Sequence, residues 1–164
     1  MFQFHSVSPK KIDRNVAALL DYLGLDQHRA VHLKFSKITQ FVSEPDNCHL
    51  NVWRHIKAAG GAPQHGWVVA QDKTKSFVEG IFHTVWKAPD GRLMDVTPRK
   101  DLEKRLLFVP DFERRIVLTQ YDSQPALHTF DNVRMLQDAL WTPLTEITTV
   151  MQDGFAQRSG LWPW

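Results

Sequence analysis

The chain contains one cysteine, Cys48, and it lies where the sequence predicts the start of a helix. A turn at residues 43–46 precedes a helix expected over residues 47–59, with Asp46 as its N-cap and two glycines at its end. A cysteine in the first turn of a helix faces the positive end of the helix dipole and unpaired backbone N–H groups, which favour the thiolate over the thiol. Cys48 is therefore a candidate nucleophile.

A nucleophilic thiolate needs an imidazole as its proton partner and a third group that fixes the tautomer of that imidazole. His83 and Asp95 follow Cys48 along the chain, on strands expected over residues 76–87 and 92–97. The order Cys-His-Asp therefore offers all three groups. We interpret Cys48, His83 and Asp95 as a candidate catalytic triad.

The turn between these two strands decides whether His83 and Asp95 can meet. Residues 88–91 (APDG) fit a three-residue loop in which Gly91 is left-handed. That loop pairs Ala88 with Arg92 and makes His83 and Asp95 diagonal neighbours on one face of the sheet. A two-residue Asp-Gly loop would shift the register by one residue and put Asp95 on the other face. The fixed φ of proline favours the three-residue loop.

The elements that must position these residues predict an α+β fold. Besides the helix over residues 47–59, an amphipathic helix is expected over residues 11–25, and Trp-rich or β-branched stretches predict a strand over residues 66–71. Further strands are expected over 106–109 and 114–119 and, more loosely, within 31–42, and two more helices near 132–141 and 143–158. A helix followed by a meander of strands predicts a central helix packed on an antiparallel sheet.

Four segments together resemble the transglutaminase-like branch of the papain-like cysteine enzymes. These are CHLNVWRHIKAAGG from position 48, GW at 66–67, HTVW at 83–86 and DGRLMDVTP at 90–98. The resemblance covers about residues 44–98 and implies a minimal fold of that family. It implies that Cys48 attacks a carboxamide or thioester carbonyl, that His83 acts as base and acid, and that Asp95 orients His83.

The resemblance also extends to the surroundings of the nucleophile. It implies an oxyanion hole formed by the Cys48 backbone N–H and a side chain from the preceding segment, for which Gln40 is the best-placed candidate. Trp67 and Trp86 are candidates to line a substrate cleft, or else aromatic residues of the core. The sequence departs from the family pattern at His49, where a tryptophan is usual.

Composition limits the class of protein. With 164 residues, 43% hydrophobic and 23% charged, the chain fits one globular domain spanning residues 1–164. The net charge of +2 does not point to nucleic acid or a membrane as partner. The N-terminus does not resemble a secretory signal, so we expect a cytoplasmic protein, or one delivered by a signal-less secretion route, acting on a protein or peptide substrate without a cofactor.

Two alternatives from other classes remain open. The chain is also consistent with a non-catalytic interaction module that keeps the papain-like fold, which predicts a thiol of ordinary reactivity. A metalloprotein would draw on some of the eight histidines, including His28 and His32 four residues apart, and His49, His55 and His65 near Cys48. No C-x-x-C or H-E-x-x-H motif supports that reading, and we expect no metal site.

Overall fold

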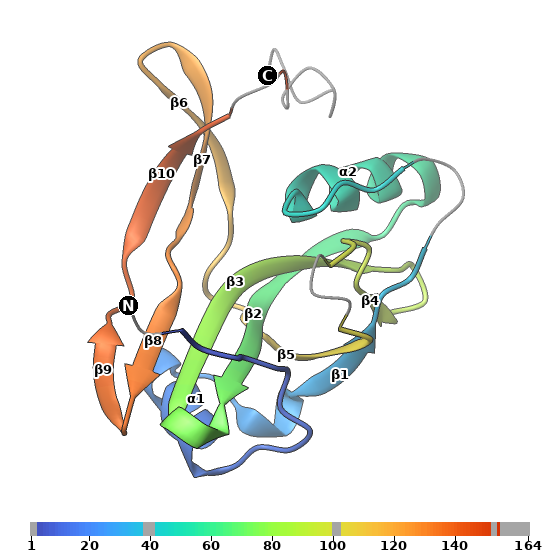
Figure 1. Ribbon diagram of the computed structural model, residues 1–164. Coiled ribbons are helices and arrows are strands. Elements are labelled where there is room, and N and C mark those ends of the chain that lie inside the picture. The colour runs from blue at the N-terminus through green and yellow to red at the C-terminus, as the bar shows by residue number, and fades with distance from the viewer. Residues whose placement is uncertain (1–2, 38–41, 100–102, 152–153, 155–164) are drawn as a thin grey trace.

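The computed structural model describes residues 3–37, 42–99, 103–151 and 154 (Figure 1). Within them lie ten strands, two α-helices and two short 3-10 helices, η1 (Gln27–Arg29) and η2 (Lys73–Lys75). Strands account for 43% of the described residues and helices for 20%, so the expectation of an α+β fold with a central helix packed on a sheet is wrong: the protein is β-rich. Neither described helix is long and apolar enough to cross a lipid bilayer.

A seven-stranded sheet forms the larger part of the fold, in the order β1-β5-β2-β3-β8-β9, with β4 paired to β3. β2 (Ala62–Asp72) and β3 (Phe77–Lys87) pair antiparallel along their whole length, which confirms the strands expected over residues 66–71 and 76–87. The remaining strands of this sheet are β1 (Val31–Lys34), β4 (Leu93–Met94), β5 (Arg105–Pro110), β8 (Val133–Leu136) and β9 (Ala139–Thr142). The long β2–β3 hairpin is thus the frame on which the site is built.

The first helix, α1 (Arg14–Leu23), confirms the amphipathic helix expected over residues 11–25. The Asp13 side chain caps it by accepting a backbone N–H of the first turn, and Gly24, left-handed at φ 69°, ends it. Its buried face packs on the sheet, where Gly80 of β3 leaves room for close contact, and consists of Val16, Leu19, Leu20 and Leu23. α1 therefore stabilises the sheet from this face, and none of its residues lines the Cys48 cavity.

The second helix, α2 (Cys48–Ala59), confirms the helix expected over residues 47–59, although it begins one residue later, and Gly60 is its C-cap. Its N-cap is Asn47 and not Asp46, which precedes it in a left-handed turn conformation at φ 61°. α2 buries Val52 against Trp86, Ala88 and Val96, at the end of the β2–β3 hairpin. It covers this end of the sheet and leaves the rest to α1.

A second, three-stranded sheet has the order β10-β7-β6 and stands beside α2 and the main sheet (Figure 1). Its strands are β6 (Val117–Tyr121), β7 (Gln124–Phe130) and β10 (Glu146–Val150). The helices expected near residues 132–141 and 143–158 are therefore wrong over their described parts, which form β8, β9 and β10. A tight turn explains the error over residues 132–141: Gln137 and Asp138 take positive φ without glycine and close a two-residue hairpin between β8 and β9.

Candidate active site

The loop after β3 sets the position of Asp95 relative to His83. The Ala88 N–H donates to the Arg92 carbonyl at 2.9 Å, and the Gly91 N–H donates to the Ala88 carbonyl at 2.8 Å. Gly91 is left-handed at φ 88°, and the pairing of β3 with β4 continues this register. The three-residue loop is confirmed, and the two-residue alternative is excluded.

Asp95 follows β4 directly and is held from several sides. Its carbonyl accepts the Ser36 N–H at 2.8 Å, in a short parallel contact just after β1. Its Oδ1 accepts the Thr97 N–H at 3.1 Å and lies 3.1 Å from His83 Nε2. The strand expected over residues 92–97 is shorter for this reason, because at Asp95 the chain leaves β3 for the residues that follow β1. The Asp95 side chain is 1% exposed, and so its orientation is fixed by these bonds.

α2 brings Cys48 to the edge of β3 beside His83. β3 pairs with β8 near one end and with β4 near the other, and no described strand pairs with that edge between them. There Cys48 and His83 line one cavity together with Asp95. The His83 imidazole and the Thr84 backbone N–H lie near enough to the Cys48 sulfur to lower the pKa of the thiol, while His83 Nε2 bonds the Asp95 carboxylate. The structure thus gathers the sulfur, the imidazole and the carboxylate around one cavity, and the imidazole and the carboxylate are hydrogen-bonded.

The pKa values of Cys48 and His83 are shifted in opposite directions, each toward the charged form of its side chain. Burial by itself would raise the pKa of the Cys48 thiol, but the hydrogen bond and charge of His83, together with the Thr84 N–H, lower that pKa below its ordinary value. Burial would likewise lower the pKa of His83, but hydrogen bonds to Asp95 and Cys48 and their negative charges raise that pKa to about 10. Each group therefore favours the charged form of the other, a thiolate beside an imidazolium.

Asn51, which sequence reasoning missed, ties the segments around the site together. It is fully buried in α2, and its Nδ2 donates to Thr97 Oγ1 at 3.2 Å and to the Glu44 carbonyl at 2.8 Å. Its Oδ1 accepts the Glu44 N–H at 2.9 Å. Asn51 therefore joins the helix of Cys48 to the strand end of Asp95. The signal in the sequence was a polar residue between two apolar ones on a helix that buries most of its sides.

A cavity of about 350 Å³ opens at the three residues. Cys48 is half-buried, so its sulfur is within reach of a small molecule entering this space. Asp46 and Arg99 place charges of opposite sign in the wall. The other lining residues besides the triad are Ile81, Phe82, Thr97 and Pro98. The cavity is large enough for one side chain or a short stretch of peptide.

The other candidate residues lie elsewhere. Trp67 is fully buried in the core and donates its Nε1–H to Asp111 Oδ2 at 3.0 Å. Trp86 is 6% exposed and donates its Nε1–H to the Gly60 carbonyl at 2.9 Å, which fastens the end of α2 to β3. Neither tryptophan lines the cavity at Cys48, and both are core residues. Gln40, the oxyanion candidate, lies outside the described residues.

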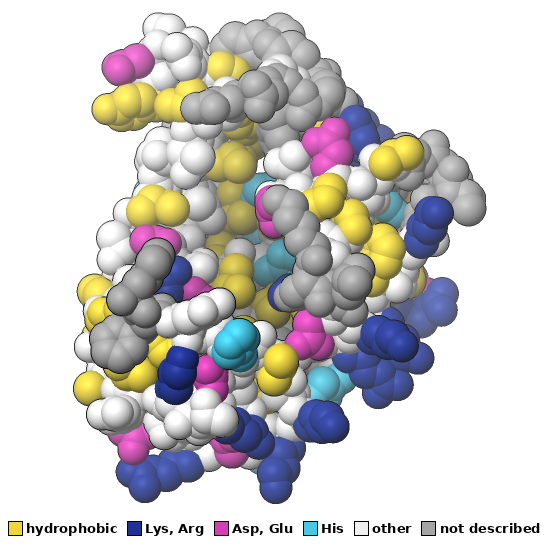
Figure 2. All heavy atoms as spheres, viewed as in Figure 1, with side chains coloured by type: hydrophobic (Ala, Val, Ile, Leu, Met, Phe, Trp, Pro, Cys, Tyr) yellow, Lys and Arg dark blue, Asp and Glu magenta, His cyan; other side chains and the backbone are white. Residues whose placement is uncertain are grey.

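A neighbouring cleft of about 300 Å³ separates α2 from the three-stranded sheet. Figure 2 shows a hollow there, with hydrophobic and histidine side chains along its floor. Burial and the nearby His65 and His83 lower the pKa of His49 to about 3, and burial and Arg115 lower the pKa of His65 to about 4. Both rings are neutral near pH 7, so His83 is the cationic histidine of this region.

Among the residues that the structure describes, no group of three or more His, Cys, Asp or Glu side chains is arranged to hold a metal ion. Two histidines near Cys48 are instead hydrogen-bonded within the fold: His65 Nδ1 lies 2.9 Å from Thr84 Oγ1, and His55 Nδ1 lies 2.8 Å from the Asn51 carbonyl.

The chain matches no model of a known protein family, and comparisons with curated proteins and with solved structures give no significant match either.

Proposed function

We propose that the protein is a cysteine-dependent hydrolase or acyl transferase that acts on amide bonds, with Cys48 as nucleophile. The observation that carries the proposal is the gathering of Cys48, His83 and Asp95 around one cavity, with His83 hydrogen-bonded to Asp95 and the pKa of the Cys48 thiol lowered by His83. Desolvated thiols that have no partner titrate above their ordinary range, so a pKa lowered by His83 despite burial supports an activated Cys48. The same three residues are the ones that the transglutaminase-like resemblance singles out.

The proposed reaction has two steps. The Cys48 thiolate attacks the carbonyl carbon of an amide, and His83 gives its proton to the departing nitrogen, which leaves as ammonia or an amine while a thioester forms. Water or a second amine then attacks the thioester, His83 accepts its proton, and the Cys48 thiolate is released. Asp95 keeps the imidazole oriented through both steps. The Cys48 backbone N–H, at the start of α2, stabilises the oxyanion.

We expect the substrate to be a protein or peptide. A cavity of about 350 Å³ admits a side-chain carboxamide or a short peptide segment. Peptidase, amidase, deamidase and transglutaminase reactions share the two steps and differ in the leaving group and the acceptor. A reduced thiol suits the cytoplasm, or a target cell reached by a signal-less secretion route.

The pH dependence of Cys48 alkylation by iodoacetamide tests the activated thiol. In the unmodified protein we expect an apparent thiol pKa well below the free value of about 8.5, rising above that value in His83→Ala. His28→Ala, which removes an exposed histidine, is the matched control and leaves the pKa unchanged. Circular dichroism verifies that each variant is folded, and Asp95→Asn gives a second, nearly isosteric change to the same site.

Acyl transfer itself is tested with hydroxylamine, which intercepts a thioester as a hydroxamate. Incubated with a mixture of glutamine- and asparagine-containing peptides, the protein is expected to yield peptide hydroxamates detected by mass spectrometry, and Cys48→Ala to yield none. An ordinary thiol pKa that His83→Ala leaves unchanged, together with no hydroxamate, would instead support the non-catalytic interaction module.

A further inference from the structure

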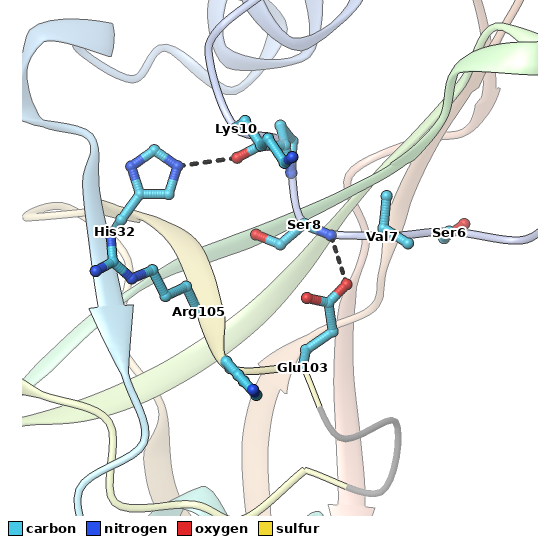
Figure 3. A pocket seen from close by; sticks show the side chains of 9 residues that line it. Ser6, Val7, Ser8, Lys10, His32, Glu103 and Arg105 are labelled. Carbon is cyan, nitrogen blue, oxygen red and sulfur yellow. Dashed lines mark hydrogen bonds between the residues drawn. The ribbon is translucent and has the colours of Figure 1, made fainter.

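A second cavity, of about 680 Å³, lies between the N-terminal segment, β1 and the start of β5 (Figure 3). Its volume is in the range of small-molecule sites. We call it the basic pocket, and its polar lining includes Ser8, Lys10, His32, Glu103, Lys104 and Arg105. It shares no lining residue with the cavity at Cys48, so its ligand does not depend on the proposed cysteine chemistry.

Positive charge dominates the basic pocket. Lys10, Lys104 and Arg105 face a single carboxylate of the lining, Glu103, and Glu103 Oε1 already accepts the Ser8 N–H at 3.0 Å. Within the described part of the chain, no acidic side chain lies within ion-pair distance of the two lysines or the arginine. The described carboxylates therefore leave these three cations without an ion-pair partner.

A fourth cation adjoins them on β1. Lys34 stands directly opposite Arg105 in the antiparallel pairing of β1 with β5, and His32 lies on the same face two residues earlier. Like charges directly opposite each other on paired strands destabilise the pair. Figure 2 shows Lys and Arg side chains gathered along the lower right of the molecule, where Figure 1 places β1. An anion bound between these side chains would remove the repulsion.

The Ser8 hydroxyl adds a neutral donor to the arrangement. Ser8 Oγ accepts the Leu107 N–H at 2.7 Å, so its hydroxyl hydrogen can donate to a ligand. His32 Nε2 lies 2.9 Å from the Pro9 carbonyl, which only accepts hydrogen bonds, and the ring therefore carries a hydrogen on Nε2. Figure 3 shows Ser8 in the middle of the pocket, with His32 and Arg105 on one side and Glu103 below. Ser8 is thus placed to bond an anion that Arg105 attracts.

We propose that the basic pocket binds a phosphate group, carried either by a small molecule or by a phospholipid headgroup. The Arg105 guanidinium bonds two phosphate oxygens with its parallel N–H groups, a geometry that suits phosphate. Lys10, Lys34 and Lys104 neutralise the remaining charge, and the Ser8 hydroxyl donates to a third oxygen. The negative charge of one or two phosphate groups matches the net positive charge of three to four cations and one carboxylate.

Calorimetric titration with inorganic pyrophosphate at low ionic strength tests the pocket. We expect saturable binding with one site per chain, and a loss of affinity of about tenfold for each cation removed, hence about a hundredfold in Lys104→Gln/Arg105→Gln. The matched control, Lys87→Gln/Arg92→Gln, removes one exposed lysine and one exposed arginine outside the pocket and leaves the affinity nearly unchanged. Lys10→Gln, an exposed single change, gives an independent measure on a minimally altered protein.

Vesicles distinguish the two sources of phosphate. Flotation with phosphatidylcholine vesicles that contain phosphatidic acid, prevented by free pyrophosphate and by the pocket variant, assigns the site to a lipid headgroup. Saturable pyrophosphate binding without flotation assigns it to a small molecule. The proposal is overturned if pyrophosphate shows no saturable binding, or if both double variants lose affinity equally, since the attraction would then be nonspecific.

Discussion

Replacing Cys48 with alanine is expected to lower the pKa of His83 well below its value of about 10. The thiolate raises that pKa in two ways, through a hydrogen bond and through its charge. Two unit charges about 4 Å apart interact by roughly 4 kcal/mol at an effective dielectric constant of about 20, which corresponds to about 3 pKa units. Asp95 remains beside the ring, and its bond offsets the effect of burial.

Nuclear magnetic resonance measures this pKa from the ring protons of His83. The chain has eight histidines, and the His83 signal is identified as the one that His83→Gln removes. Because the coupling between the two groups is reciprocal, the thiol pKa of Cys48 in His83→Gln must rise by a similar number of units. A His83 pKa that stays near 10 without the thiol, or that is near 6.5 with it, would refute the ion pair.

Three further predictions concern stability. Gly61 and Gly91 both have positive φ, but a Cβ at Gly61 would lie 2.3 Å from a backbone oxygen, whereas one at Gly91 would meet nothing. In urea unfolding, Gly91→Ala is therefore expected to lose about 1 kcal/mol of stability, and Gly61→Ala several kcal/mol more. Asn51→Leu, which leaves buried partners without hydrogen bonds, is expected to cost about 2–3 kcal/mol in the same assay, and an unchanged midpoint would contradict its linking role. The raised pKa of His83 contributes its full stabilisation of the fold at pH values below 6.5, and this contribution is lost as the pH rises toward about 10. The lowered pKa of Cys48 contributes its full stabilisation at pH values above 9.0, and this contribution is lost as the pH falls. The two trends offset each other at intermediate pH, so the free energy of unfolding is expected to fall by about 1.4 kcal/mol between about pH 9 and 10, and a Cys48→Ser/His83→Gln variant is expected to lack this fall.

Local chemistry made the His83–Asp95 half of the site predictable. The residues APDG allow few loop geometries, and once Gly91 is left-handed the register of the hairpin follows. The position of α2 was also readable, since an apolar face and terminal glycines mark it. The contact of Cys48 with His83 was a hypothesis at the level of chain order, because only tertiary packing brings the helix to the edge of β3.

The C-terminal third could not be assigned from its pattern. Val133, Leu136 and Leu140 recur at a spacing that fits a helix, while Val133 and Met135 alternate as in a strand, and the structure follows the second pattern. The deciding feature is the Gln137-Asp138 turn, whose positive φ values are unusual without glycine. Asn51 and the Thr84 N–H were invisible for a related reason: their partners are distant in sequence and come from the packing of α2 against the sheet.

The two contacts of His83 differ in the length of chain that each must close. Asp95 is twelve residues away across a tight hairpin, and such hairpins form within microseconds, whereas Cys48 is reached only after a helix has docked across a long loop. During folding, the imidazole and the carboxylate are therefore expected to meet first, while the sulfur is still an ordinary thiol. A nascent or partly unfolded chain would then carry no reactive nucleophile, and its only cysteine would gain reactivity at the moment the fold is complete.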